Sequence, residues 1–143
     1  MKRLFLGVLA ATCLTAGAHA QSDDTGPIVT PAGSVQFARL EGDFVASLDG
    51  KPFDRFHANA LTHFDELADT TDTVARSVVT TDSGPVLYDF RRNPPLVQRS
   101  GKRMNVRRVF WQGDDVVMQG SDGWFRLKGG VLTRLQSTKS IYR

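Results

Sequence analysis

The chain has 143 residues, with 18 lysine and arginine side chains, 15 aspartate and glutamate side chains and a single cysteine, Cys13. A single cysteine excludes an intramolecular disulfide, so an apolar core must stabilise the fold. The charge is uneven, because residues 21–83 carry 4 basic and 11 acidic side chains while residues 84–143 carry 12 basic and 4 acidic ones. This asymmetry predicts a basic C-terminal half that attracts acidic partners.

Residues 1–20 have the pattern of a secretory signal peptide. A short basic start and a largely apolar stretch over residues 4–16 precede a small-x-small cleavage site that ends at Ala20. We therefore predict cleavage near Ala20 and a periplasmic or secreted mature protein with no cysteine and no transmembrane segment. Lipidation of Cys13 is the alternative, although Thr12 is bulkier than the residue that such processing usually accepts.

Residues 21–33 are rich in proline, glycine and small polar side chains, which predicts a flexible N-terminal segment without fixed structure. Residues 34–143 are then expected to form a single β-rich domain. Early in this domain, two short runs of alternating apolar residues flank Asp49-Gly50. This dipeptide suits a two-residue hairpin turn because glycine accepts a positive φ angle.

The next segment has a different periodicity. Leu61, Phe64 and Leu67 recur at helical spacing, and Asn59 is a suitable N-cap. We expect one short helix over about residues 59–69.

Turn signals then recur at short intervals in the C-terminal part of the chain. Gly113-Asp114, Ser121-Asp122-Gly123 and Gly129-Gly130 separate runs of β-branched and aromatic residues. This spacing is typical of an antiparallel meander. Together with the single helix, it predicts a mainly β fold, either a small antiparallel β-barrel or a sandwich, with a C-terminal meander.

Residues 91–108 carry seven basic side chains and no acidic one. Because alternate residues of a strand share a face, the runs around Arg103 and Trp124 each divide into an apolar and a basic set. If the apolar sets are the core, both tryptophans lie on the basic side. The predicted binding face then consists of Arg103, Arg107, Trp111, Trp124, Arg126 and Lys128. Tryptophan and arginine are enriched at binding hot spots.

These residues favour a binding protein over an enzyme. We expect an inhibitor, a neutralising protein or an envelope accessory protein that binds an acidic protein or an anionic envelope component. An anionic membrane surface is a further target, although no long basic amphipathic helix is visible to insert into it. Export and the absence of a recognition motif argue against nucleic acid. The alternative is that the basic residues have no partner and are simply the solvated outer side chains of a sheet.

A small hydrolase is the rival from a different class. On the expected helix His63 and Glu66 lie one turn apart, and His57 precedes them, so the three side chains could ligate a catalytic metal ion. Alternatively, the neighbouring carboxylates of Asp65 and Asp69 could supply the acid and the base of a hydrolase that uses no metal, as in glycosidases. No HExxH pattern is present, and carboxylates on a short helix usually form its solvated face. We therefore expect no metal, no cofactor and no catalytic residue.

Overall fold

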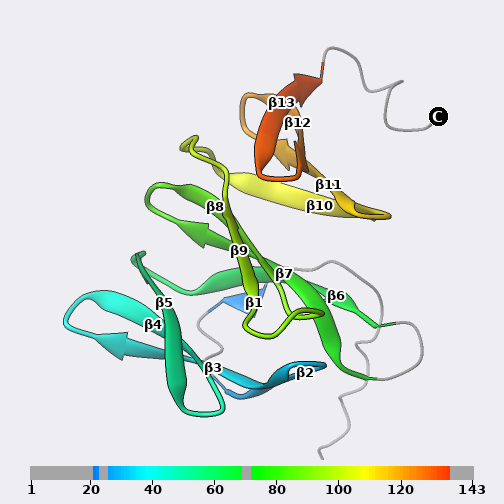
Figure 1. Cartoon of the computed structure of the whole chain (residues 1–143). Coiled ribbons are helices and arrows are strands. Elements are labelled where there is room, and N and C mark those ends of the chain that lie inside the picture. Colours follow the sequence, from blue (N-terminus) through cyan, green and yellow to red (C-terminus); the bar gives the residue numbers. More distant parts are fainter. Residues whose placement is uncertain (1–20, 23–25, 69–71, 136–143) are drawn as a thin grey trace, which may run out of the picture.

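The computed structural model describes residues 21–22, 26–68 and 72–135 (Figure 1). Within these residues it contains strands and no helix, which confirms the predicted mainly β fold. The strands form three open antiparallel sheets, so neither the barrel nor the sandwich is confirmed. No helix in this part of the chain is long and apolar enough to cross a membrane.

Each sheet contains a four-stranded meander, and the central sheet has one additional short strand at its edge. The N-terminal sheet consists, in spatial order, of β2 (Ile28–Thr30), β3 (Gly33–Leu40), β4 (Asp43–Leu48) and β5 (Lys51–His57). The central sheet consists of β1 (Gln21–Ser22), β6 (Thr62–Leu67), β7 (Val74–Thr81), β8 (Gly84–Asp89) and β9 (Leu96–Arg99). The C-terminal sheet consists of β10 (Val106–Gln112), β11 (Asp115–Gly120), β12 (Gly123–Lys128) and β13 (Val131–Leu135).

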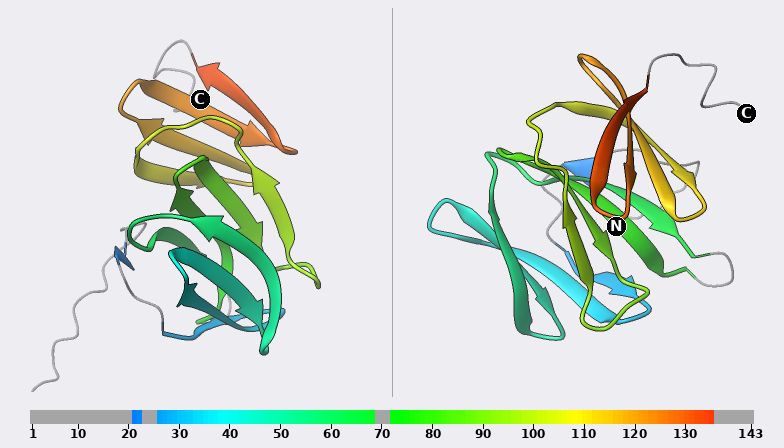
Figure 2. Two further views of the ribbon diagram at one scale, coloured as in Figure 1. Left: turned by 90° about the vertical axis from the view of Figure 1, so that its left-hand side faces the viewer. Right: turned by 45° about the horizontal axis from the view of Figure 1, so that its top comes forward.

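The three sheets stack in the order of the sequence, with the central sheet between the other two (Figures 1 and 2). Phe37 and Phe44 of the N-terminal sheet pack with Tyr88 of the central sheet in one core, which we call the N-terminal core. Phe64 of the central sheet packs with Phe125 of the C-terminal sheet in a second core, the C-terminal core. Burial of apolar surface on both sides of the central sheet therefore joins the three layers.

The central sheet has no solvated face over most of its length. In β7, Val79 enters the N-terminal core and Val78 enters the C-terminal core. In β8, Tyr88 lies in the N-terminal core and Leu87 lies in the C-terminal core. Buried residues therefore run almost continuously along both strands, instead of alternating with exposed ones.

Two of the predicted features are confirmed. Asp49 and Gly50 connect β4 and β5 in a two-residue turn with Leu48 opposite Lys51, and their φ angles are 49° and 85°. Both residues occupy the left-handed region that this turn requires. The predicted C-terminal meander is the C-terminal sheet, whose strands follow one another in sequence order.

The prediction of a helix over residues 59–69 is wrong for the described residues of this range, where the structure contains β6. Leu61 and Phe64 are both buried, but they lie in the two different cores on opposite sides of the sheet. A strand that is covered on both faces has apolar residues at irregular spacings, and here those spacings resemble the period of a helix.

The predictions for the N-terminal residues have different outcomes. The predicted signal peptide lies outside the described residues. Residues 21–33 were expected to lack structure, but Gln21–Ser22 pairs with β6 and Ile28–Thr30 pairs with β3. Thr30 also closes the turn before β3, since its hydroxyl donates to the carbonyl oxygen of Gly33 at 2.7 Å. Proline and glycine in this segment therefore mark a turn between paired strands.

Candidate functional site

The six residues of the predicted binding face lie in four different places. Trp124, Arg126 and Lys128 of β12 share one face of the C-terminal sheet, Trp111 lies on the other face, and Arg103 lines a pocket between sheets. Arg107 is exposed on β10. The structure thus keeps three of the six residues together on one face of a sheet.

The assignment of Trp111 to the basic side is corrected by the register of β10. A β-bulge at Arg107 shifts the pairing between Val106 and Arg108. The extra residue reverses the alternation, so that Val106 and Trp111 both pack against the C-terminal core. The guanidinium carbon of Arg76 lies 4.9 Å from the centroid of the Trp111 ring, which places this tryptophan inside the fold.

The opposite side of the C-terminal sheet faces away from the stack, and we call it the outer face. Phe110 lies opposite Val117, which lies opposite Arg126, and Trp124 is two residues before Arg126. The Phe110 and Trp124 rings are in contact, with centroids 5.6 Å apart and planes at 32°. Val117 has no exposed surface even though no described sheet covers it. The larger side chains around it therefore form a small apolar cluster on the outer face.

Arg108 and Lys128 lie on the outer face, and Arg107 lies at the bulge next to Arg108. Arg107, Arg108 and Lys128 are exposed, and none has a carboxylate within 4.0 Å in the described part of the chain. By contrast, the Arg126 Nε atom lies 3.7 Å from a carboxylate oxygen of Asp115. Two unpaired charges on the outer face and a third at its bulge give this face a positive potential that an acidic partner can neutralise.

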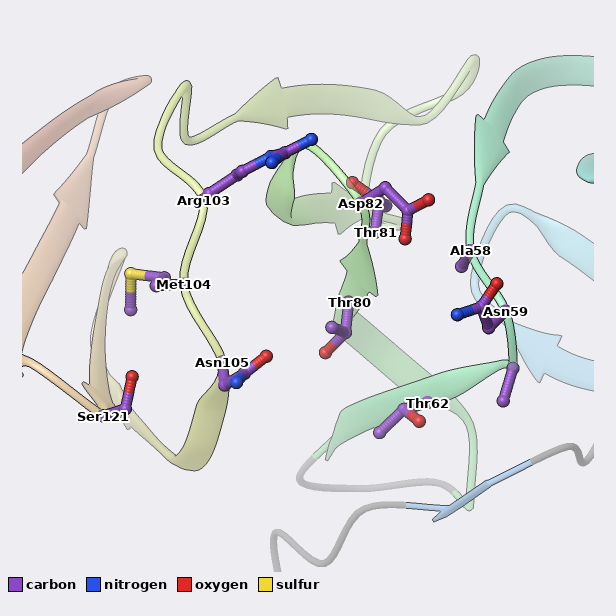
Figure 3. Close-up of a pocket in the computed structure, with 11 residues that line it drawn as sticks. Ala58, Asn59, Thr62, Thr80, Thr81, Asp82, Arg103, Met104, Asn105 and Ser121 are labelled. Atoms are coloured by element: carbon purple, nitrogen blue, oxygen red, sulfur yellow. The ribbon is translucent and has the colours of Figure 1, made fainter.

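A pocket of about 700 Å³ lies where connections of the three sheets meet (Figure 3). Its lining comes from the β5–β6 connection, the start of β6, the end of β7 with the turn that follows it, the segment before β10 and the turn after β11. Among the described residues that line it, Arg103 is the only basic one and Asp82 is the only acidic one.

Close packing of the backbone positions Arg103. Gly84 has a φ angle of 114°, and a Cβ atom there would lie 2.0 Å from the carbonyl oxygen of Lys102. Only glycine permits this approach, which holds the segment before β10 against the start of β8. The adjacent Met104 is buried and anchors the same segment in the C-terminal core. Arg103, between these two anchors, extends over the pocket (Figure 3).

The three residues of the alternative hydrolase site are not brought together. His57 is exposed and its two ring nitrogens lie 3.1 Å from Asp43 and 3.1 Å from Asp82. His63 is buried against Phe37 in the N-terminal core, whereas Glu66 binds Arg76 on the opposite side of the central sheet. Residues three apart in a strand point to opposite faces, although they would share a face on a helix.

No group of three histidine, cysteine, aspartate or glutamate residues in the described residues could hold a metal ion. Asp43 instead forms an ion pair, and hydrogen bonds from Arg55 and His57 hold its pKa below the usual range. The cluster of His57 with two carboxylates is thus a set of ion pairs between β4, β5 and the turn after β7.

Acid is expected to destabilise the protein through Asp89. Burial opposes ionisation of this carboxyl, but hydrogen bonds from Arg91 outweigh it and hold its pKa below the ordinary value of 3.8. A lowered folded-state pKa stabilises the fold above the unfolded value, and this stabilisation is lost as the pH falls through the folded pKa. Urea unfolding at neutral pH and at about pH 3 measures this loss. Asp89→Asn is expected to show a smaller acid-induced loss, and an unchanged loss would contradict this role.

A scan against protein-family models finds no match for this chain. Searches of curated proteins and of solved structures find no match either. A proposal about function therefore has to rest on the residues and the structure of this chain.

Several residues of these surfaces carry no signal in the sequence alone. Phe110 and Arg108 join the outer face only because of the bulge at Arg107. Thr62, Thr80 and the other pocket residues come from strand ends and connections far apart in the sequence. An irregular run of apolar residues around residues 104–111 is the one hint of the bulge that the sequence contains.

Proposed function

We propose that this is an exported protein that binds an acidic protein partner through the outer face of the C-terminal sheet. The observation that supports the proposal is the contacting pair Phe110 and Trp124 on a sheet face that no other described sheet covers. Such a pair offers a rigid apolar anchor that loses little side-chain entropy on binding. Ordinary solvation of a sheet does not require two contacting aromatic rings on its outside.

The unpaired cations supply the second part of the mechanism. Arg107, Arg108 and Lys128 have no acidic neighbour that would neutralise them in the described part of the chain. They accelerate the encounter with an acidic surface, after which the aromatic pair is buried in the contact. An anionic envelope component would be attracted by the same charges, but it would not need the aromatic anchor.

We expect Trp124→Ala to weaken partner binding about 30-fold, equivalent to about 2 kcal/mol, because it removes a central aromatic anchor. The experiment captures partners from the extracytoplasmic fraction of the host on immobilised residues 21–143, and then measures the dissociation constant of the recovered acidic protein. Lys128→Glu is a second variant at an exposed position, and its main expected effect is a slower association at low salt.

Arg92→Gln is the matched control, because Arg92 is an exposed cation without an ion pair in the described residues and lies outside the outer face. It should bind like the unmodified protein. Circular dichroism establishes that each variant is folded. A folded Trp124→Ala variant with full affinity would exclude the outer face. Recovery of anionic lipid or polysaccharide in place of a protein would identify an envelope component instead.

A further inference from the structure

The pocket between the sheets is separate from the outer face and has a chemistry of its own. At about 700 Å³ it has the size of a small-molecule site. None of its described lining residues is aromatic, so these residues offer no ring for stacking against a nucleobase or another flat ligand. Figure 3 shows its polar side chains on strand ends and connections that face one another across the opening.

Most of the polar lining is uncharged. Thr62, Thr80 and Ser121 contribute hydroxyl groups, and Asn59 and Asn105 contribute amides. No side chain of these five makes a hydrogen bond within the described residues. Hydroxyl and amide groups both donate and accept hydrogen bonds, as do the hydroxyl groups of a sugar. The lining is therefore complementary to a ligand that carries several hydroxyl groups.

The charged lining favours one anionic group on that ligand. Arg103 has no carboxylate within 4.0 Å in the described part of the chain, and its side chain extends across the pocket (Figure 3). Asp82, the only acidic side chain in the described lining, already has His57 Nε2 at 3.1 Å from its Oδ2 atom. An anion is thus attracted to the free guanidinium, which can donate two parallel hydrogen bonds to a carboxylate or a phosphate.

We propose that this pocket binds an acidic sugar, a carbohydrate with one carboxylate or phosphate group. Arg103 binds the acidic group, and the uncharged side chains of the lining bind the sugar hydroxyls. This binding is independent of the proposed partner contact, because the pocket shares no residue with the outer face.

The test is calorimetric titration of the protein with glucuronate and glucose 6-phosphate, with glucose and inorganic phosphate as comparison ligands. Both acidic sugars should bind at least about 10-fold more tightly than glucose, because only they carry an acidic group that accepts charge-assisted hydrogen bonds from Arg103. Both should also bind more tightly than inorganic phosphate. Arg103→Gln should reduce the affinity for the acidic sugars to the level for glucose. Arg92→Gln, outside the pocket, should leave all affinities unchanged.

Thr80→Val separates sugar recognition from anion binding, because it removes a hydroxyl at nearly constant volume. It should weaken both acidic sugars and leave inorganic phosphate binding unchanged. Inorganic phosphate that binds as tightly as glucose 6-phosphate would overturn the assignment of a sugar. Acidic sugars that bind a folded Arg103→Gln variant with full affinity, or that do not bind the protein at all, would overturn the site.

Discussion

Replacing Glu66 by alanine is expected to lower the free energy of unfolding by about 3–5 kcal/mol, because it removes the carboxylate that pairs with the buried charge of Arg76. Arg76 has 1% of its side chain exposed, while Glu66 has 25%. The two form a bidentate pair, with distances of 2.5 Å from Nε to Oε1 and 2.9 Å from Nη2 to Oε2. Arg76 also donates to the carbonyl oxygen of Gly113 at 2.6 Å, which links the central sheet to the C-terminal sheet.

Replacing Arg76, the other member of the ion pair, should lower the free energy of unfolding by less. In Arg76→Met the carboxylate of Glu66 is left alone, but water can solvate it because a quarter of that side chain is exposed. Methionine also retains apolar contact with Trp111. Urea unfolding of both single variants and the double variant measures the two costs and their coupling. A larger loss for Arg76→Met than for Glu66→Ala would contradict this explanation.

The features that the sequence predicts well are those that local chemistry determines. Asp49-Gly50 needs only its own φ angles to make a turn, and the residues on either side pair as expected. The C-terminal meander has the same basis, since Gly113, Gly123 and Gly129 all have positive φ angles at its turns. Neighbouring strands that are joined by short turns pair with each other in sequence order.

The features that the sequence does not predict depend on distant partners. The sequence pattern indicates that Glu66 is a solvated residue of a helix, whereas in the structure it lies opposite Arg76 on the next strand. His63 is buried because it packs on Phe37, which lies in a different sheet. The central sheet is covered on both faces, so the alternation that normally identifies a strand is missing from it.

Among the predicted binding residues, some positions follow from local chemistry and others depend on the rest of the fold. The exposure of Arg107 and Lys128 follows from their charge. The position of Trp111 follows from a single bulge, which reverses every side chain beyond it. The pocket brings together side chains from five connections and strand ends, whose spacing no local pattern encodes.

Replacing Phe37 by alanine is expected to cost about 3–5 kcal/mol, the usual range for a large aromatic side chain removed from a core. Phe37 has no exposed surface, and its ring centroid lies 6.0 Å from that of Phe56 and 6.2 Å from that of Tyr88. This loss of stability should affect all three sheets, and not the N-terminal sheet alone. If that sheet separated, the central sheet would expose Tyr88 and the other apolar residues of its N-terminal face to water.

The three layers should therefore unfold in one transition. Both tryptophans lie in the C-terminal sheet, so their fluorescence reports on the layer most distant from Phe37, while far-UV circular dichroism reports on all strands. In Phe37→Ala the two signals should move together to a lower urea midpoint, as two-state unfolding requires. Val29→Ala, at a side chain that is 61% exposed, should change stability by less than about 0.5 kcal/mol. A fluorescence midpoint that stays unchanged while the dichroism midpoint falls would mean that the layers unfold separately, which would contradict the expected single domain over residues 34–143.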